Sequence, residues 1–160
     1  MAGAHSDAGS EPTLLYFTDP MCSWCWGFAP VVDELAKKMA LEVVAGGLRV
    51  NEVRPMTADI RDTVQGHWRK VTELTGQPFK LEGSLPDGFF YNSEPACRAL
   101  VTVREIAPGK TLPWLHRLQQ AFYSEAVDIT NGNELARLAA ELSIDGFAEA
   151  FESAEIREAT

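Results

Sequence analysis

Two cysteines, separated by two residues, are the residues of this sequence most suited to a chemical function. Cys22 and Cys25 lie in the segment DPMCSWCWGFAP, residues 19–30, between an apolar run and an amphipathic stretch. A thiol pair at this spacing can bind a metal, close a structural disulfide or exchange disulfides with another molecule. The spacing alone does not choose among these, so the elements that position the pair have to be considered.

A strand is predicted directly before the pair and a helix directly after it. Residues 13–18, TLLYFT, are apolar, aromatic and β-branched, and Asp19 before a proline is typical of a turn. From Trp24 onward the apolar residues recur at helical spacing, and residues 41–45, LEVVA, predict a second strand. Strand, helix and strand within about 35 residues form a βαβ unit with parallel strands. Cys22 is therefore expected where the first strand meets the amino terminus of the helix.

The chain from Pro55 onward is predicted to be almost wholly helical. Three helices are expected to begin at capping residues, namely Thr57, Ser93 and Asn131. A further helix carries apolar residues in register, namely Leu112, Leu115, Leu118 and Phe122. The last helix is predicted over residues 147–156, with no strand after it. In the helix that follows the cysteines, the residues expected to face the core are Phe28, Val31, Val32, Leu35, Ala36 and Met39.

The composition is that of a single domain with a sizeable core. The chain has 160 residues, 46% of them apolar, so neither a disulfide nor a metal is needed to stabilise it. The formal charge of -9, with scattered basic residues, argues against a nucleic-acid partner. No stretch has the length of a membrane span and the amino terminus lacks signal-peptide features, so we expect a cytoplasmic protein with no membrane partner. Residues 1–12 are small and polar and predict a flexible tail.

In a reducing compartment, cysteines are more often catalytic or metal-binding than joined in permanent disulfides. At the start of a helix, the Cys22 thiolate would face unpaired backbone N–H groups and the positive end of the helix dipole, which both lower the pKa of a thiol. We expect Cys22 to be the exposed nucleophile that forms a mixed disulfide, and Cys25 to be the shielded thiol that resolves it. Such a role needs no metal or nucleotide cofactor, because the Cys22–Cys25 disulfide is itself the redox group.

A structural zinc site is the alternative use of the same pair. It requires two further ligands, most often another close pair of Cys or His. His5, His67 and His116 are isolated in the sequence, and Cys97 lies on an apolar helix face, which is typical of a buried and inert cysteine. The sequence therefore predicts redox use of the pair and no metal. A role for Cys97 as a third redox thiol remains open.

Several segments resemble the thioredoxin-fold oxidoreductases of the DsbA family. The first strand, the residues around the cysteines and the proline five residues after the second cysteine resemble that family's active-site region. YNSEPACRALV, residues 91–101, and LQQAFYSEAVDIT, residues 118–130, are similar to its cytoplasmic, FrnE-type branch. The resemblance runs from Thr13 to the end of the chain, and it implies that Pro30 bends the active-site helix.

The fold class that follows is α/β, a thioredoxin-like fold with a large inserted α-helical domain. Residues 13–55 would supply the amino-terminal βαβ half of the thioredoxin-like domain, and residues 56–160 the helical insertion. The family's last two strands, its last helix and its cis-proline loop have no counterpart in the sequence, whose last proline is Pro113. We therefore expect these parts to be missing, and an open sheet edge and an uncovered apolar face to favour association, including as a homo-oligomer.

Four residues around the cysteines are candidates for tuning the pair or for contacting substrate. Ser23 and Trp24 lie between the cysteines, where dipoles, desolvation or an aromatic contact can act, and the alternative for Trp24 is a surface aromatic or a docking face. Pro20 and Met21 would shape a shallow apolar groove for a flexible substrate segment, or else only pack the loop. Asp19 is predicted to be a turn residue rather than a proton relay.

These observations predict a thiol:disulfide oxidoreductase, of the oxidase or isomerase type, that acts on protein or peptide thiols and disulfides through Cys22 and Cys25. Glutathione is a candidate redox partner. Two alternatives remain open. One is a glutathione-binding transferase or isomerase of the kappa type, which resembles the DsbA fold but typically has serine in place of Cys22. The other is a helical interaction module, not an enzyme, with the cysteine pair as a metal clip. The direction of net electron flow does not follow from the residues between the cysteines.

Overall fold

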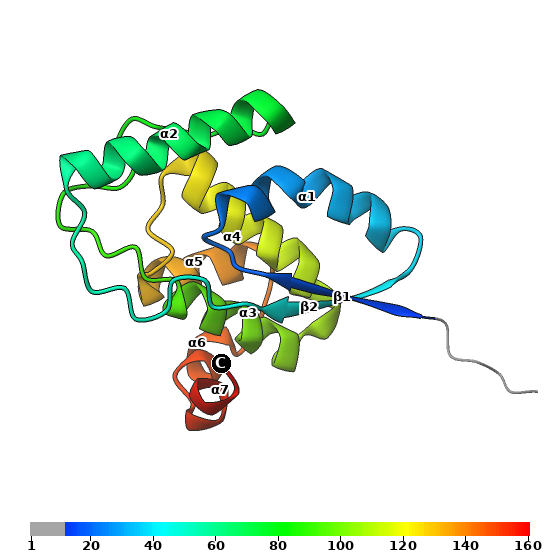
Figure 1. Cartoon of the computed structure of the whole chain (residues 1–160). Coiled ribbons are helices and arrows are strands. Elements are labelled where there is room, and N and C mark those ends of the chain that lie inside the picture. Colours follow the sequence, from blue (N-terminus) through cyan, green and yellow to red (C-terminus); the bar gives the residue numbers. More distant parts are fainter. Residues whose placement is uncertain (1–11) are drawn as a thin grey trace, which may run out of the picture.

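The computed structural model describes residues 12–160, and its first elements form a small parallel sheet (Figure 1). β1 (Thr13–Thr18) pairs in parallel with β2 (Ala40–Ala45), and α1 (Ser23–Ala36) connects them. The predicted βαβ unit is therefore confirmed. The predicted flexible tail lies outside the described residues, apart from Pro12.

The rest of the described chain is helical, in the order that the sequence predicts. Its helices are α2 (Ala58–Thr75), α3 (Glu94–Ile106), the short 3-10 helix η1 (Pro108–Lys110), α4 (Thr111–Glu125), α5 (Gly132–Glu141), α6 (Phe147–Phe151) and α7 (Ala154–Ala159). The caps predicted at Thr57 and Asn131 are confirmed, since each side chain accepts hydrogen bonds from backbone N–H groups of the first helical turn. Ser93 precedes α3 as predicted, but its hydroxyl accepts from the N–H of Arg49 instead of capping the helix.

The predicted single helix over residues 147–156 is wrong. α6 ends at Phe151, and α7 begins after Ser153, whose hydroxyl accepts a hydrogen bond from the N–H of Ile156 and so starts a new helix. The guanidinium of Arg98 on α3 donates to the carbonyl of Phe151 at 2.8 Å. This bond to a neighbouring helix engages the end of α6, and a local helical pattern cannot reveal it.

The two faces of the sheet differ in burial. Side chains alternate across a strand, so Tyr16 and Val43, which are register partners, share one face. That face meets the core, where Val43 is 4% exposed. Leu15 and Phe17 point to the opposite face and are 52% and 65% exposed. Among residues 12–160 this apolar face has no cover, as the sequence predicts, and the association expected from it stays a prediction.

α1 buries only part of the apolar side that its sequence pattern predicts, including Val32. Its buried residues are Trp26, Gly27, Ala29 and Val32. Phe28 and Val31 are each 46% exposed and Met39 is 41% exposed, so the prediction that these three face the core is wrong. The reason is the close approach of α2, since a Cβ atom at Gly27 would lie 2.7 Å from Cγ1 of Val71. The Gly27 side of α1 therefore meets the helices, and the Phe28 side is left outward.

Pro30 lies inside α1 without ending the helix. Proline has no N–H, so the carbonyl of Trp26, four residues earlier, loses its usual helical partner. The side chain of Gln77 donates to that carbonyl at 2.8 Å, and the Trp26 indole N–H donates to the carbonyl of Pro78 at 3.1 Å. These two hydrogen bonds join α1 to the segment after α2. The predicted bend at Pro30 stays a prediction.

The core lies among the helices, against the inner face of the sheet. Trp68 of α2 meets Phe122 and Tyr123 of α4 edge to face, with ring centroids 5.9 and 5.2 Å apart. Trp114 of α4 is fully buried and packs on Phe147 of α6, at 5.5 Å between centroids. Figure 1 shows α2 and the α6–α7 pair at opposite ends of the molecule, with the sheet and α4 between them. One continuous core therefore runs the length of the helical region.

The sheet of the described chain is limited to two strands. Beyond β2, the remaining strand-like pairing in residues 12–160 is an isolated antiparallel bridge between Pro55 and Phe90, and every peptide bond in this range is trans. The predicted α/β class with a large helical portion is confirmed. The predicted domain boundary after residue 55 stays a prediction. None of the helices in the described part is both long and apolar enough to cross a bilayer.

Candidate active site

Cys22 and Cys25 lie in the first turn of α1, where the sequence predicts them. Cys22 is the residue that precedes the helix; its N–H donates to the carbonyl of Asp19 at 3.0 Å, and its carbonyl accepts from the N–H of Trp26 at 3.1 Å. Both thiols are free and both are half-buried. The expected contrast between an exposed Cys22 and a shielded Cys25 is therefore wrong. Cys25 lies beside Tyr16 and Thr18 of β1.

The two thiols shift each other's pKa in opposite directions. A hydrogen bond between them lowers the pKa of Cys25 to about 6 and raises the pKa of Cys22 above its ordinary value. Burial raises the pKa of both thiols, whereas the hydroxyls of Thr18 and Tyr16 lower the pKa of Cys25. Backbone N–H groups at the start of α1 lower the pKa of Cys22, as expected, but the bond to Cys25 outweighs them. The lowered pKa of Cys25 favours one thiolate in the pair near neutral pH, and this charge belongs to the dithiol as a unit.

Asp19 holds the loop that precedes Cys22. One carboxylate oxygen accepts from the N–H of Met21 at 2.8 Å, which is the turn that the sequence predicts. The other oxygen accepts from the N–H of Leu48 at 2.7 Å and from the thiol of Cys97 at 3.5 Å. The carboxylate is 3% exposed, so these bonds replace its hydration. Asp19 therefore ties the cysteine loop both to the segment after β2 and to α3.

Cys97 is buried on α3, as predicted, with 1% of its surface exposed. Burial and the neighbouring Asp19 raise its pKa to about 12, so it remains a neutral thiol near pH 7. This environment favours a structural role. Within the part of the chain that the structure describes, no three His, Cys, Asp or Glu side chains gather as metal ligands would.

Tyr91 connects the residues before α3 to the cysteine loop. Its hydroxyl donates to the carbonyl of Met21 at 2.9 Å and lies 3.3 Å from the hydroxyl of Tyr123. Its ring lies under the guanidinium of Arg49, whose Cζ is 4.6 Å from the ring centroid. Sequence reasoning missed both Tyr91 and Arg49 as residues of the site. No spacing relative to the cysteines marks them, because the contacts are made across the fold.

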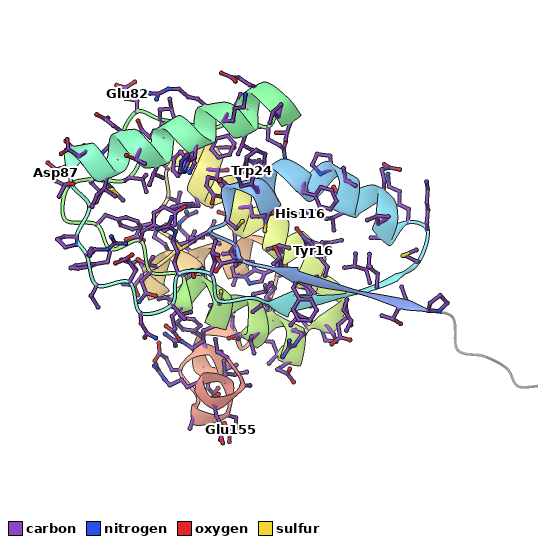
Figure 2. The ribbon with its side chains drawn as sticks, viewed as in Figure 1. Tyr16, Trp24, Glu82, Asp87, His116 and Glu155 are labelled. Carbon is purple, nitrogen blue, oxygen red and sulfur yellow. The ribbon has the colours of Figure 1, made fainter. Side chains whose placement is uncertain are left out.

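A cavity of about 150 Å³ opens beside Cys22, with Cys22 in its wall. Its other lining residues include Met21, Ser23, Trp24, Arg49, His67 and Tyr91. Trp24 is 52% exposed and projects from the first turn of α1 on the side of α2 (Figure 2). Pro20 is buried in the turn, where it packs the loop and does not line the cavity. The apolar groove predicted from the sequence therefore has a polar wall, which comes from Arg49 and His67.

The fold and the thiol pair together define a class of protein, a thioredoxin-like domain that carries inserted helices and two thiols at the start of its first helix. A scan against models of known protein families finds no match. A search of solved structures finds a "putative protein disulfide isomerase" from Nitrosomonas europaea, 38% identical, with a TM-score of 0.85; the match covers 93% of this chain and 74% of that one. The chain belongs to the DsbA-like family of thioredoxin-fold proteins.

Other relatives extend this picture. The cytosolic disulfide reductase DsbM from Pseudomonas aeruginosa is 29% identical, with TM-scores of 0.78 alone and 0.79 with GSH, and the match covers 92% of this chain and about three quarters of DsbM. A 2-hydroxychromene-2-carboxylate isomerase, 15% identical with a TM-score of 0.64, shares the fold. Among curated proteins, the ClpXP adapter protein SpxH of Halalkalibacterium halodurans is 25% identical over 144 residues, which are 84% of this chain. The chain spans about half, 47%, of the length of that protein.

Proposed function

We propose that this protein is a thiol:disulfide oxidoreductase that exchanges disulfides with protein or peptide thiols through Cys22 and Cys25. One observation carries the proposal: two free, half-buried thiols lie two residues apart at the start of α1, and one of them, Cys22, lines an open cavity. The relatives named as disulfide isomerase and disulfide reductase support the same chemistry.

Cys22 is the attacking thiol in this mechanism, because Cys22 lines the cavity and Cys25 does not. Transfer of the Cys22 thiol proton to the Cys25 thiolate moves the negative charge to the Cys22 sulfur. The Cys22 thiolate attacks a substrate disulfide, one substrate thiolate leaves and takes up a proton, and a mixed disulfide forms. Cys25 then loses its proton and attacks the Cys22 sulfur, which releases the second substrate thiolate. Two electrons pass from the dithiol to the substrate, and the reverse sequence oxidises a substrate dithiol.

We further assign the protein to the cytoplasm and to the FrnE-type branch of the family. The description of DsbM as cytosolic, and its structure with GSH, make glutathione the first redox partner to test. Ser23 and Trp24 are the residues that we expect to tune the pair or to contact substrate, since both line the cavity beside Cys22.

A redox titration tests the proposal. The protein is equilibrated in a series of glutathione redox buffers, tryptophan fluorescence is followed, and free thiols are counted at each end. We expect a reversible transition of two thiols that disappears in Cys22→Ser and persists in the matched control Cys97→Ser. Cys97 does not line the cavity, and a serine hydroxyl in its place can still donate to Asp19. If all three thiols stay reduced throughout, the oxidoreductase assignment is refuted.

A binding function is the second candidate. The curated relative SpxH is named as an adapter, and α1 presents an outward apolar stripe of Trp24, Phe28 and Val31, each at least 46% exposed. An adapter function would survive loss of both active-site thiols and fail when Phe28 and Val31 are changed to serine. Stoichiometric zinc in the purified protein would instead favour the metal clip.

A further inference from the structure

Arg49 lies in the wall of the cavity beside Cys22 with its charge unpaired. Among residues 12–160, no carboxylate forms an ion pair with its guanidinium, and the guanidinium donates no hydrogen bond there. The nearby carboxylate of Glu52 is engaged by Arg54, at 2.7 Å. We propose that Arg49 makes this cavity selective for small disulfides and thiols that carry carboxylates, of the kind that glutathione represents. The inference rests on the proposed exchange at Cys22 and names its substrate class.

Two sets of contacts hold Arg49 in place before any substrate binds. The N–H of Arg49 donates to the hydroxyl of Ser93 at 3.1 Å, and the N–H of Ser93 donates to the carbonyl of Arg49 at 3.3 Å. The guanidinium lies over the ring of Tyr91, a cation–π contact that leaves the edge of the guanidinium fork free to donate. An arginine fixed in this way can bind a carboxylate through two parallel hydrogen bonds with little further loss of freedom.

Tyr91 contacts both Arg49 and the cysteine loop. Its ring lies under the Arg49 guanidinium, and its hydroxyl donates to the carbonyl of Met21, the residue before Cys22. A carboxylate bound at Arg49 and a sulfur presented to Cys22 would therefore occupy one cavity. Arg49 also lines two further hollows, of about 30 and 400 Å³.

The net charge of the whole chain bears on what Arg49 can bind. The formal charge of -9 repels an anionic substrate at long range. A local cation beside the nucleophile is then needed to bind such a substrate in a productive orientation, and a neutral or cationic disulfide has no use for it. The unpaired Arg49 therefore points to an acidic substrate in preference to a neutral or basic one.

The reaction with oxidised glutathione is balanced without a further reactant. The Cys22 thiolate attacks one glutathione sulfur, a Cys22–glutathione disulfide forms, and the first glutathione thiolate leaves and takes up a proton. Cys25 attacks the Cys22 sulfur, the Cys22–Cys25 disulfide forms, and the second glutathione leaves as a thiol. One molecule of reduced protein thus supplies the two electrons that convert one oxidised glutathione to two glutathiones.

Single-turnover kinetics with three probes test the proposal. The reduced protein is mixed with oxidised glutathione, which is anionic, with neutral hydroxyethyl disulfide or with cationic cystamine, and tryptophan fluorescence is recorded. We expect Arg49→Gln to slow the reaction with oxidised glutathione by about tenfold or more, which is the effect of losing a charged hydrogen-bond partner. The rate with hydroxyethyl disulfide should stay within about twofold, since no substrate charge meets Arg49. Arg49→Lys should recover part of the rate with oxidised glutathione.

The matched control is Arg69→Gln, which changes the net charge equally from an exposed position that does not line the cavity. It should leave all three rates unchanged. A uniform slowing of the three probes in Arg49→Gln, or no slowing with oxidised glutathione, would overturn the role of Arg49 while leaving the exchange chemistry intact. A reduced wild-type protein that reacts with none of the probes would instead refute the proposed function, and this inference with it.

Discussion

The βαβ unit and the helical region of this molecule differ in how much apolar surface they bury. Within residues 12–160, nine of the twelve exposed large apolar side chains lie between residues 15 and 53, all of them in or next to the βαβ unit. The helices from α2 onward contain the most deeply buried residues, among them Trp114, Leu115 and Leu118, each fully buried. We infer that the helices contribute most of the free energy of unfolding, whereas the reactive thiols lie in the less buried part.

Contacts between the two regions position the thiols. The Asp19 carboxylate accepts from the Cys97 thiol on α3, Tyr91 donates to Met21 beside Cys22, and Gln77 donates to Trp26 on α1. The helical region therefore acts as a rigid support for the cysteine loop. Substitutions within the helical core should change the free energy of unfolding, and substitutions at these contacts should also change the chemistry of the thiols.

The largest expected effect is on stability, from Trp114→Ala. Trp114 is fully buried, packs on Phe147 and donates its indole N–H to the carbonyl of Ala99 at 3.0 Å. The cavity left behind should lower the free energy of unfolding by about 3–5 kcal/mol, measured by urea unfolding followed by circular dichroism. Trp24→Ala, at a half-exposed position of the βαβ unit, should cost less than about 0.5 kcal/mol. An equal loss of unfolding free energy in the two variants would contradict the view that the helices supply most of the stability.

The next effect is at the contact between the regions, from Asp19→Ala. Removal of the carboxylate leaves the buried N–H of Met21 and the part-buried N–H of Leu48 without this acceptor. We expect a loss of about 2–3 kcal/mol in urea unfolding. We also expect faster alkylation of Cys97, located by mass spectrometry, because its packing loosens. Asp19→Asn keeps one acceptor oxygen and should lose less. If the urea midpoint of Asp19→Ala equals that of the wild type, the cysteine loop is held by other contacts.

A third prediction concerns the pH dependence of the thiols. The pKa of Cys25 is lowered to about 6, so the rate of iodoacetamide alkylation of the pair should rise with pH, through a midpoint near this value, and level off above it. Cys22→Ala removes the hydrogen bond that is the largest cause of the lowering. It should raise the midpoint for Cys25 by about one unit or more, equivalent to about 1.4 kcal/mol per unit. Cys97→Ser supplies a hydroxyl that can donate to Asp19 and should leave the midpoint unchanged. An unshifted midpoint in Cys22→Ala would contradict the interaction between the two thiols.

The smallest effect is expected on the uncovered face of the sheet, from Phe17→Thr. Phe17 is 65% exposed on a β-strand, and threonine is also a good strand former. The free energy of unfolding should stay within about 0.5 kcal/mol of wild type, and thiol exchange should be unaffected. Analytical ultracentrifugation at high concentration tests the predicted association, which Phe17→Thr should weaken. A large loss of stability would mean that this face is covered.

Local signals in the sequence predict the position of the thiols and the elements other than the break between α6 and α7. TLLYFT, residues 13–18, predicts β1 with the observed bounds, and Thr57 and Gly76 mark the two ends of α2. Cys22 was correctly predicted at the start of α1, because the turn before it and the helical spacing after it are both encoded within a few residues.

The rest could not be predicted, because it depends on contacts between distant segments. The outward position of Phe28 follows from the close approach of α2 to the other side of α1. The hydroxyl of Ser93 is used by Arg49 and not by its own helix. The lowered pKa of Cys25 depends on the geometry of the two sulfurs, which spacing does not determine. The cavity wall that contains Arg49 joins the cysteine loop, α2 and the segment after β2, and it exists only in the folded chain.

The hydrogen bonds around Trp26 have a use in spectroscopy. The Trp26 indole proton is held by the carbonyl of Pro78, and the side-chain amide of Gln77 is held by the carbonyl that Pro30 leaves free. Both protons should exchange with deuterated solvent only when α1 separates from the segment after α2. Their exchange rates, read from NMR spectra of the unmodified protein, would therefore report the free energy of that local opening in the oxidised and reduced states.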